Sequence, residues 1–252
     1  MMLLDVGNSS VKWAIWEESG LASRGRFIHL DKDFAQGATG AWGDLPEPAA
    51  VAVANVAGAG MEQAITAWTR EKWNITPRYL RASGTAAGVK SAYTVPGNLG
   101  VDRWAAMVAA YREFECPVCI IDCGTAITID VLSADGVHRG GLIMPGIGIM
   151  KRSLVEDTAG ISVEFGDNPA PETLLAMSTR DAVNNGVVYM AAAVVDRIMV
   201  DFAATPGENT EIIITGGDAG YLLPFLIRQP RHDPCLVLKG VAILAGDSVC
   251  AT

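Results

Sequence analysis

The fold is decided by the stretch Leu3-Leu4-Asp5-Val6-Gly7-Asn8-Ser9 and by a later stretch of the same form, Ile120-Ile121-Asp122-Cys123-Gly124-Thr125-Ala126. Each is an apolar run, an Asp, a Gly two residues later, a small polar residue and a second apolar run. The two Asp residues are 122 − 5 = 117 positions apart, close to half of the 252 residues. This repeat predicts two domains of like topology, 1–115 and 116–252, although two unrelated buried strands ending in turns would read the same way.

Strand-like and helix-like runs alternate along the chain, which predicts an α/β fold with some parallel strands buried on both faces. The expected strands are Met2–Val6, Val11–Trp16, Val51–Val56, Val118–Asp122, Ala126–Leu132, Val137–Met144 and Glu211–Thr215. The expected helices are Met61–Trp73, Val101–Phe114, Pro171–Ala203 with a break, and Gly240–Val249. A hairpin is expected at Asp135-Gly136, and an irregular connection is expected over residues 32–48.

The composition weighs against several classes of function. The chain has 19 Lys and Arg against 28 Asp and Glu, a net charge of −9, and no basic cluster, so neither nucleic acid nor an anionic membrane is the expected partner. No apolar run approaches the ~20 residues of a membrane span. The first ten residues have no basic segment, so no signal peptide is expected. Five cysteines, an odd number, indicate a reducing cytoplasm.

The two Asp-x-Gly turns are suited to binding phosphate. Glycine leaves the backbone N–H groups unobstructed, and such groups bind anions. The Asp at the strand end can hold Mg²⁺ directly or through water, and Lys12 can add a positive charge. Two facing turns would hold a triphosphate from both sides. The simpler interpretation is that Asp5 and Asp122 only cap turns.

Two further segments have both a structural and a functional interpretation. Asp102, in Gly100-Val101-Asp102-Arg103, either caps the expected helix or accepts a hydroxyl proton at the edge of a cleft. Arg103 beside it can bind a carboxylate in bidentate fashion. The glycines of Thr215-Gly216-Gly217 let the backbone approach a flat ligand, although a plain strand-to-helix turn has the same sequence.

Three other patterns are incomplete. The pair in Cys116-Pro117-Val118-Cys119 leads into a strand and has no partner pair, so neither a metal nor a redox role is expected. The turn Gly58-Ala59-Gly60 would suit a nicotinamide dinucleotide, but Gln63 stands where the third Gly or Ala belongs. The three histidines are too scattered to form a ligand pattern.

With these motifs, the sequence resembles the type III pantothenate kinase family, within the acetate and sugar kinase/Hsc70/actin superfamily. The resemblance covers nearly the whole chain and rests on five motifs in the family's order, Asp5–Ser9, Gly100–Trp104, Asp122–Ala126, Gly140–Gly146 and Thr215–Gly217. It implies two ribonuclease-H-like (actin-like ATPase) domains with ATP in the cleft between them. It also implies phosphorylation of pantothenate by ATP, the first step of coenzyme A biosynthesis.

The resemblance implies roles for individual residues, with Asp102 as the general base. The residues expected to bind pantothenate are Tyr93, Gly100, Val101, Arg103 and Thr179. The residues expected to bind ATP are Asp5, Val6, Gly7, Asn8, Ser9, Ser10, Val11, Lys12 and Thr125. Asp122 matches a ligand of a monovalent cation, potassium or ammonium, and Asp5 is expected to contact the Mg²⁺ of MgATP. The family also implies a homodimer, for which Pro171–Ala203 is the candidate face.

Three alternatives remain open from the sequence: a non-catalytic accessory or regulatory relative, another actin-like phosphotransferase or phosphohydrolase acting on a sugar or polyphosphate, and a nicotinamide-dependent enzyme. The accessory relative is disfavoured because Asp5, Asp102 and Asp122 are all retained. The other phosphotransferase is disfavoured because the resemblance implies that Tyr93 and the segment around Asp102 contact pantothenate rather than ATP. One position departs from some relatives, since Ile127 stands where they have a hydroxyl residue; this bears on ATP affinity or the cation site.

Overall fold

The computed structural model describes residues 1–29, 33–161, 174–203 and 210–247. These residues form two compact units. The first unit contains Met1–Glu115, the segment Leu132–Gly140 and the described residues from Cys235 onward, and the second contains the rest. The second half of the chain therefore contributes two segments to the first unit. The division into domains 1–115 and 116–252 stays a prediction.

Five strands form the sheet of the first unit, in the order β3-β2-β1-β4-β5. Their bounds are β1 Met2–Val6, β2 Ser10–Glu17, β3 Gly20–Ile28, β4 Val51–Asn55 and β5 Arg78–Tyr79. β2 pairs antiparallel with both β1 and β3, whereas β1–β4 and β4–β5 are parallel pairs. β1, β3, β4 and β5 therefore run in the same direction, and their carboxyl ends meet at one edge of the sheet.

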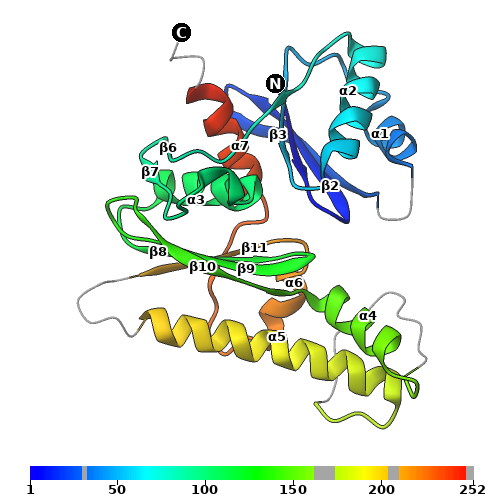
Figure 1. Cartoon of the computed structure of the whole chain (residues 1–252), viewed down its shortest axis with the longest axis vertical. Helices are drawn as coiled ribbons and strands as arrows, with labels where there is room; N and C mark the ends of the chain where they lie inside the picture. Colours follow the sequence, from blue (N-terminus) through cyan, green and yellow to red (C-terminus); the bar gives the residue numbers. More distant parts are fainter. Residues whose placement is uncertain (30–32, 162–173, 204–209, 248–252) are drawn as a thin grey trace. The chain divides into compact units, whose positions relative to one another are not determined.

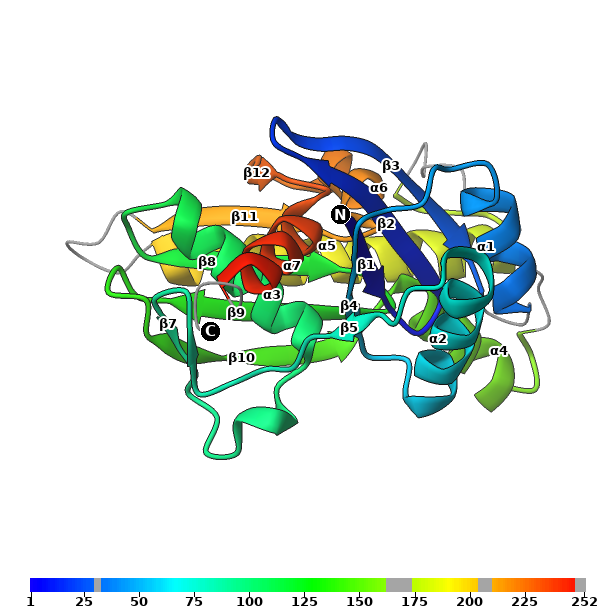
Figure 2. The same ribbon diagram turned by 90° about the horizontal axis from the view of Figure 1, so that it is seen from above.

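Helices cover both faces of this sheet (Figure 1 and Figure 2). α1 (Phe34–Trp42) and α2 (Ala59–Trp73) pack on one face, where Trp42 and Trp68 make edge-to-face ring contacts at 5.3 Å. α3 (Val101–Glu113) and α7 (Leu236–Asp247) pack together on the other. Gly240 of α7 lies against the backbone of Ala105, where a Cβ would overlap it. The remaining elements of this region are β6 Thr85–Ala86, β7 Val89–Lys90 and the 3₁₀ turn η1 Pro96–Asn98.

The second sheet repeats the strand order of the first, as β10-β9-β8-β11-β12. Its strands are β8 Val118–Cys123, β9 Ala126–Leu132, β10 His138–Pro145, β11 Glu211–Thr215 and β12 Arg231–His232. β8 takes the place that β1 has in the first sheet, so the two Asp-x-Gly motifs occupy equivalent positions, as the internal similarity predicts. β8 and β11 are parallel, like β1 and β4.

Helices also cover the second unit's sheet. They are α4 Ile147–Asp157, α5 Thr179–Ala203, α6 Ala219–Leu222 and the 3₁₀ turn η2 Leu223–Phe225. Buried side chains of α5 join those of β8, β9 and β11 in one apolar core, and α5 runs along the sheet in Figure 1. Within the described residues, one helix segment, Thr179–Phe202, is long and apolar enough to cross a membrane, but 56% of its most apolar window is buried inside the protein, as in the core helix of a globular domain.

The expected strands agree with the structure to within one or two residues, and the hairpin at Asp135-Gly136 is confirmed, with Gly136 at φ 78°. The irregular connection expected over 32–48 is wrong for its central part, which forms α1. Asp33 caps this helix by accepting the Ala35 N–H at 3.0 Å. Packing of one buried face, rather than helix propensity, stabilises it, since two of its nine residues are glycines.

Other helix boundaries also differ from expectation. α5 is continuous over Thr179–Ala203 rather than broken, while residues 171–173 of the expected helix lie outside the described residues. α7 begins at Leu236 instead of Gly240, and residues 248 and 249 lie outside the described residues. α4 and β3 were not expected. β3 is mostly exposed, and its apolar residues are interrupted by Ser23, Arg24 and Arg26, so it lacks the apolar run that marks a buried strand.

Candidate active site

The first Asp-x-Gly motif lies at the carboxyl edge of the first sheet. Asp5 is the penultimate residue of β1 and is 7% exposed. Lys12 is its register partner on β2, with Nζ 3.6 Å from the Asp5 carboxylate. After β1 the chain turns tightly, and the Gly7 N–H donates to the Ser10 carbonyl at 3.1 Å. Asn8 at the tip of the turn is exposed. The edge thus combines a buried carboxylate, an ammonium group and a tight turn with an exposed residue at its tip.

Burial raises the pKa of the Asp5 carboxyl above its ordinary value of 3.8. Lys12 opposes this rise in pKa through its charge and a hydrogen bond, whereas the Asp102 carboxylate adds to it. Burial is the largest of these effects, so the charge of Lys12 does not fully offset the cost of burying the Asp5 anion. A divalent cation beside it would supply the missing charge.

Asp102 and Arg103 lie in the first turn of α3. The Asp102 Oδ1 accepts the Arg103 N–H at 2.7 Å, which holds the carboxylate at the helix N-terminus. The Arg103 side chain is buried, and its Nη1 donates to the Tyr93 hydroxyl at 3.0 Å. The Arg103 guanidinium also lies over the Tyr93 ring at 5.8 Å, and that ring stacks on His138 with centroids 6.1 Å apart. The first unit therefore presents a positioned carboxylate next to a positioned guanidinium.

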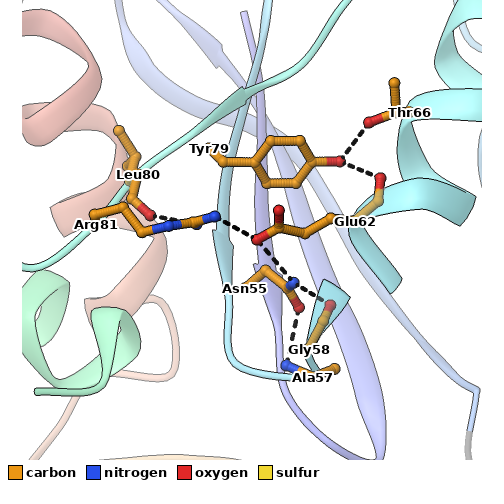
Figure 3. A network of polar contacts seen from close by, with 8 residues as sticks. All are labelled: Asn55, Ala57, Gly58, Glu62, Thr66, Tyr79, Leu80 and Arg81. Atoms are coloured by element: carbon orange, nitrogen blue, oxygen red, sulfur yellow. Dashed lines mark hydrogen bonds and ion pairs between the residues drawn. The ribbon is translucent and has the colours of Figure 1, made fainter. Parts of the chain in front are cut away.

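A polar network fixes the loop after β4 at the same edge (Figure 3). The Asn55 Nδ2 donates to the Gly58 carbonyl at 2.9 Å. Glu62 pairs with Arg81 at 2.6 Å and lies 3.5 Å from the Asn55 amide. Gly58 has φ 89°, a backbone conformation that favours glycine. The geometry of the turn thus explains its first glycine without a bound dinucleotide.

The second Asp-x-Gly motif also forms a tight turn after its strand, in the second unit. The Gly124 N–H donates to the Ala126 carbonyl at 3.0 Å, closing the turn after β8. The Gly146 N–H donates to the Thr125 carbonyl at 3.1 Å. A Cβ on Gly146 would overlap the carbonyls of Gly124 and Thr125, so glycine is required for this close approach. The residues before α4 therefore hold the turn in place.

The Gly-Gly segment packs on the same motif. Thr215 pairs with Asp122 across β11 and β8. Gly216 has φ 99°, and a Cβ there would overlap the Cys123 carbonyl and the Asp122 carboxylate. The Asp218 N–H donates to the Cys123 carbonyl at 2.8 Å. Burial, with smaller contributions from Asp122 and Asp218, raises the pKa of the Cys123 thiol to about 12, so this thiol stays protonated and unreactive.

A buried lysine lies behind this segment. Lys151 of α4 is 2% exposed, and its Nζ donates to the Asn184 Oδ1 of α5 at 2.5 Å. The Tyr221 hydroxyl of α6 donates to the same oxygen at 3.4 Å. Burial lowers the pKa of Lys151, whereas the charge of Asp218 raises it. This cluster joins three helices beneath the Gly-Gly turn.

Thr179 is exposed at the first residue of α5. The start of this helix is a hydrogen-bonded cap, in which the Asp181 N–H donates to the Ser178 Oγ at 3.1 Å and the Ser178 hydroxyl donates to the Asp181 carboxylate at 2.7 Å. The cap fixes the position of Thr179 in the second unit.

The family model of type III pantothenate kinase matches residues 1–201. The chain belongs to this family. It is 38% identical to a type III pantothenate kinase of Nitrosococcus oceani, over 98% of this chain and 94% of that protein. It is 36% identical to one of Halorhodospira halophila, over 95% of each chain. The chain therefore phosphorylates pantothenate in coenzyme A biosynthesis, with ATP and a divalent metal ion.

Solved structures show the same fold at low identity. A Baf family transcriptional activator from Campylobacter jejuni aligns with a TM-score of 0.58 at 20% identity, covering 99% of this chain and 100% of that one. A protein described as a 2-dehydro-3-deoxygalactonokinase from Sinorhizobium meliloti aligns with a TM-score of 0.59 at 15% identity, covering 97% and 95%. Together with the repeated sheets, these alignments establish the fold of two ribonuclease-H-like domains that is typical of actin-like kinases.

The structure brings several sequence-predicted residues together within each unit. Asp5, Lys12 and Asp102 interact in the first, and Asp122 and Thr125 share one turn in the second. Sequence reasoning missed the roles of two further residues, Gly146 and Lys151. Only Gly146 carried a signal, as the last residue of the family's Gly140–Gly146 motif.

The donor set fits a magnesium ion that accompanies ATP. Among the described residues, no group of three or more His, Cys, Asp or Glu side chains could hold a metal alone. Mg²⁺ takes oxygen ligands and is commonly bound by one or two carboxylates together with substrate phosphates. Asp5 matches that arrangement, because its buried negative charge is only partly offset by Lys12 and it lies beside a turn suited to binding phosphate.

The raised pKa of Asp5 has a consequence for stability. Because the folded state binds this proton more tightly than the unfolded state, stability falls as the pH rises from 3.8 through the folded-state pKa. We therefore expect Asp5→Asn to unfold at higher denaturant concentration than wild type at neutral pH, in buffer without Mg²⁺, with the difference shrinking in acid. Denaturant unfolding at several pH values measures this.

The matched control for this substitution is Asp44→Asn, which removes an exposed carboxylate. We expect it to change the unfolding free energy by less than about 0.5 kcal/mol. An Asp5→Asn protein that is less stable than wild type at neutral pH would show that the buried carboxylate is well compensated.

Proposed function

We propose that Asp102 is the general base of this pantothenate kinase and that Asp5 lies beside the transferred phosphate. The observation that carries the proposal is the electrostatic interaction between Asp102 of α3 and Asp5 of β1. Asp5 belongs to the phosphate motif and Asp102 to the substrate motif. Phosphoryl transfer requires the attacking hydroxyl and the phosphate to be held together, and these two carboxylates mark both positions.

In the proposed reaction the Asp102 carboxylate takes the proton of the pantothenate hydroxyl. As the hydroxyl oxygen bonds to the γ-phosphorus of ATP, the bond from that phosphorus to the β,γ-bridging oxygen breaks and ADP leaves. The hydrogen bond from the Arg103 N–H to Asp102 orients the carboxylate before substrate binds. Little covalent chemistry is needed, so positioning and charge neutralisation supply most of the catalysis.

Pantothenate is proposed to bind around the start of α3. Arg103, held by Tyr93 through a hydrogen bond and ring contact, is the cation for the pantothenate carboxylate. Gly100 and Val101 supply the helix N-terminus, and Thr179 is proposed to contact the substrate with its hydroxyl. A pre-positioned guanidinium loses less side-chain entropy on binding than a free one.

ATP is proposed to bind through both Asp-x-Gly motifs. The residues assigned to it are Asp5, Val6, Gly7, Asn8, Ser9, Ser10, Val11, Lys12 and Thr125. The backbone of the Gly7–Ser10 turn and the Lys12 ammonium bind phosphate oxygens, while Asp5 holds the divalent ion, which neutralises charge on the phosphates. Asp122, at the corresponding strand end of the second unit, is proposed to bind a monovalent cation, potassium or ammonium.

The chain is proposed to act as a cytoplasmic homodimer, without nucleic acid or membrane as a partner. The support for a dimer is the outer side of α5, where Tyr189, Met190 and Val200 are 60%, 49% and 48% exposed. These residues are spaced by one, ten and eleven positions, so they line one side of the helix. A second copy of the chain would remove this apolar surface from water.

We expect Asp102→Asn to lower kcat by roughly 10²–10⁴ while ATP binding is retained, because the amide cannot accept the hydroxyl proton. ADP release from MgATP with saturating pantothenate measures kcat. The control is Glu113→Gln at the other end of the same helix, which should keep nearly full activity. An Asp102→Asn enzyme with near-normal kcat would remove Asp102 from the role of base.

We expect wild-type turnover to be faster in potassium than in sodium, because the proposed site on Asp122 selects the larger ion. Asp122→Asn should lose most of this difference. Asp157→Asn, which removes an exposed carboxylate from the end of α4, is the control and should keep it. Equal dependence on potassium in the Asp122→Asn and wild-type enzymes would place the cation elsewhere.

We expect Tyr189→Glu to shift the protein from dimer to monomer in sedimentation velocity, since a charge would be buried in the proposed interface. Gln63→Glu adds the same charge on an exposed position of α2 and should leave the dimer intact. A wild-type protein that sediments as a monomer, or a Tyr189→Glu protein that stays dimeric, would contradict this interface.

A further inference from the structure

The end of β3 is hydrogen bonded to the first Asp-x-Gly turn at two points. The His29 backbone N–H donates to the Ser9 carbonyl at 3.2 Å. The His29 ring Nε2 lies 2.8 Å from the Gly7 carbonyl oxygen. This contact follows from the sheet topology, because β3 ends at the same edge as β1. His29 thereby contacts a turn that lies more than 20 positions away in sequence.

The chemistry of the contact assigns the ring proton. A carbonyl oxygen can only accept, so the His29 Nε2 must carry a hydrogen and donate it. Both the neutral Nε2–H tautomer and the doubly protonated ring meet this requirement. The hydrogen bond therefore survives protonation of the ring, and it depends on a donor at that position rather than on charge.

A bond to the Gly7 carbonyl also fixes the next backbone N–H. The chain has no cis peptide bond in its described part, and in a planar trans peptide the C=O and N–H point in opposite directions. Holding the Gly7 oxygen toward His29 therefore directs the Asn8 N–H away from His29. Asn8 is an exposed residue, so this N–H lies at the surface end of the turn.

This restraint on the Gly7–Asn8 peptide matters because Gly7 begins the turn. A glycine gives its neighbouring peptides wide rotational freedom, and rotation of the Gly7–Asn8 peptide would exchange its N–H for its carbonyl oxygen. A carbonyl facing a phosphate would repel it, whereas an N–H binds it. The Gly7 N–H bond to Ser10 restrains the preceding peptide only. The His29 ring supplies the restraint for the next one.

We propose that His29 is a positioning residue for ATP, which holds the Gly7–Asn8 peptide so that the Asn8 N–H faces the nucleotide's phosphates. This inference rests on the proposed role of the Gly7–Ser10 turn in ATP binding. It assigns to the end of β3 a part in the reaction that neither Asp-x-Gly motif indicates. His29 does not itself touch the reacting atoms.

The test compares two variants of the full-length chain. His29→Gln places an amide donor at nearly the same reach as the ring Nε2, and His29→Met has similar length without a donor. We expect His29→Met to lower kcat/KM for ATP about tenfold, the effect of a lost backbone donor, with KM for pantothenate unchanged. We expect His29→Gln to remain within about threefold of wild type.

A second readout does not depend on turnover. The Kd of a non-hydrolysable MgATP analogue, measured by calorimetry, should rise about tenfold in His29→Met and stay near wild type in His29→Gln. The two variants should have equal melting temperatures without nucleotide. A purely structural role would instead lower the melting temperature and leave the Kd and kcat/KM for ATP unmoved.

Three outcomes would overturn the inference. They are a His29→Met enzyme with wild-type kcat/KM and Kd, a His29→Gln enzyme as impaired as His29→Met, and a KM for pantothenate that rises as much as that for ATP. Failure of the proposed ATP-binding role of the turn would look different, because Lys12→Gln, which removes the ammonium group proposed to bind phosphate beside the turn, would then also keep the wild-type Kd for the MgATP analogue. That result would remove the basis of the inference as well.

Discussion

A carboxylate buried at the end of a central strand is the constraint on which the site depends. Asp5 is the penultimate residue of a strand whose residues are all buried, and the Lys12 ammonium lies 3.6 Å from its carboxylate. Withdrawing a carboxylate from water is unfavourable unless charge or hydrogen bonds compensate it. β1 therefore ends at the edge of the sheet, where a bound cation can supply the positive charge that Lys12 alone does not. Asp102 at the start of α3 adds negative charge to the same edge, which makes a bound cation more favourable.

The second unit has a turn at the equivalent position, held by different supports. β8 takes the place of β1 in the repeated sheet, and Asp122 takes the place of Asp5. Here close backbone contacts hold the turn, since Gly146 and Gly216 bring neighbouring segments to distances that no Cβ would allow. Lys151 supplies a buried positive charge beneath this arrangement. Each unit thus contains one Asp-x-Gly turn. The first is stabilised by the Asp5–Lys12 ion pair and by His29, and the second by the close packing of glycines.

Much of this could be predicted from the sequence because strong local signals coincide with it. The repeated Asp-x-Gly pattern predicted the equivalent strands, and the family's motifs pointed to Asp102 and Arg103. The remainder depends on contacts between distant residues. α1 is stabilised by packing of Trp42 and its neighbours rather than by propensity. His29 contacts Gly7 only because β3 and β1 end at one edge, and Lys151 lies in a helix that the sequence pattern did not predict.

The most direct test of the central claim is the pKa of Asp5 itself. Carboxyl ¹³C NMR of full-length protein labelled at aspartate, with Asp5→Asn to assign the signal, gives this pKa with and without MgATP. We expect a pKa above 3.8 in the free protein, because burial outweighs the Lys12 ion pair, and a lower pKa when MgATP supplies the missing cation. A pKa at or below 3.8 in the free protein, unchanged by MgATP, would contradict the claim that this buried carboxylate organises the site.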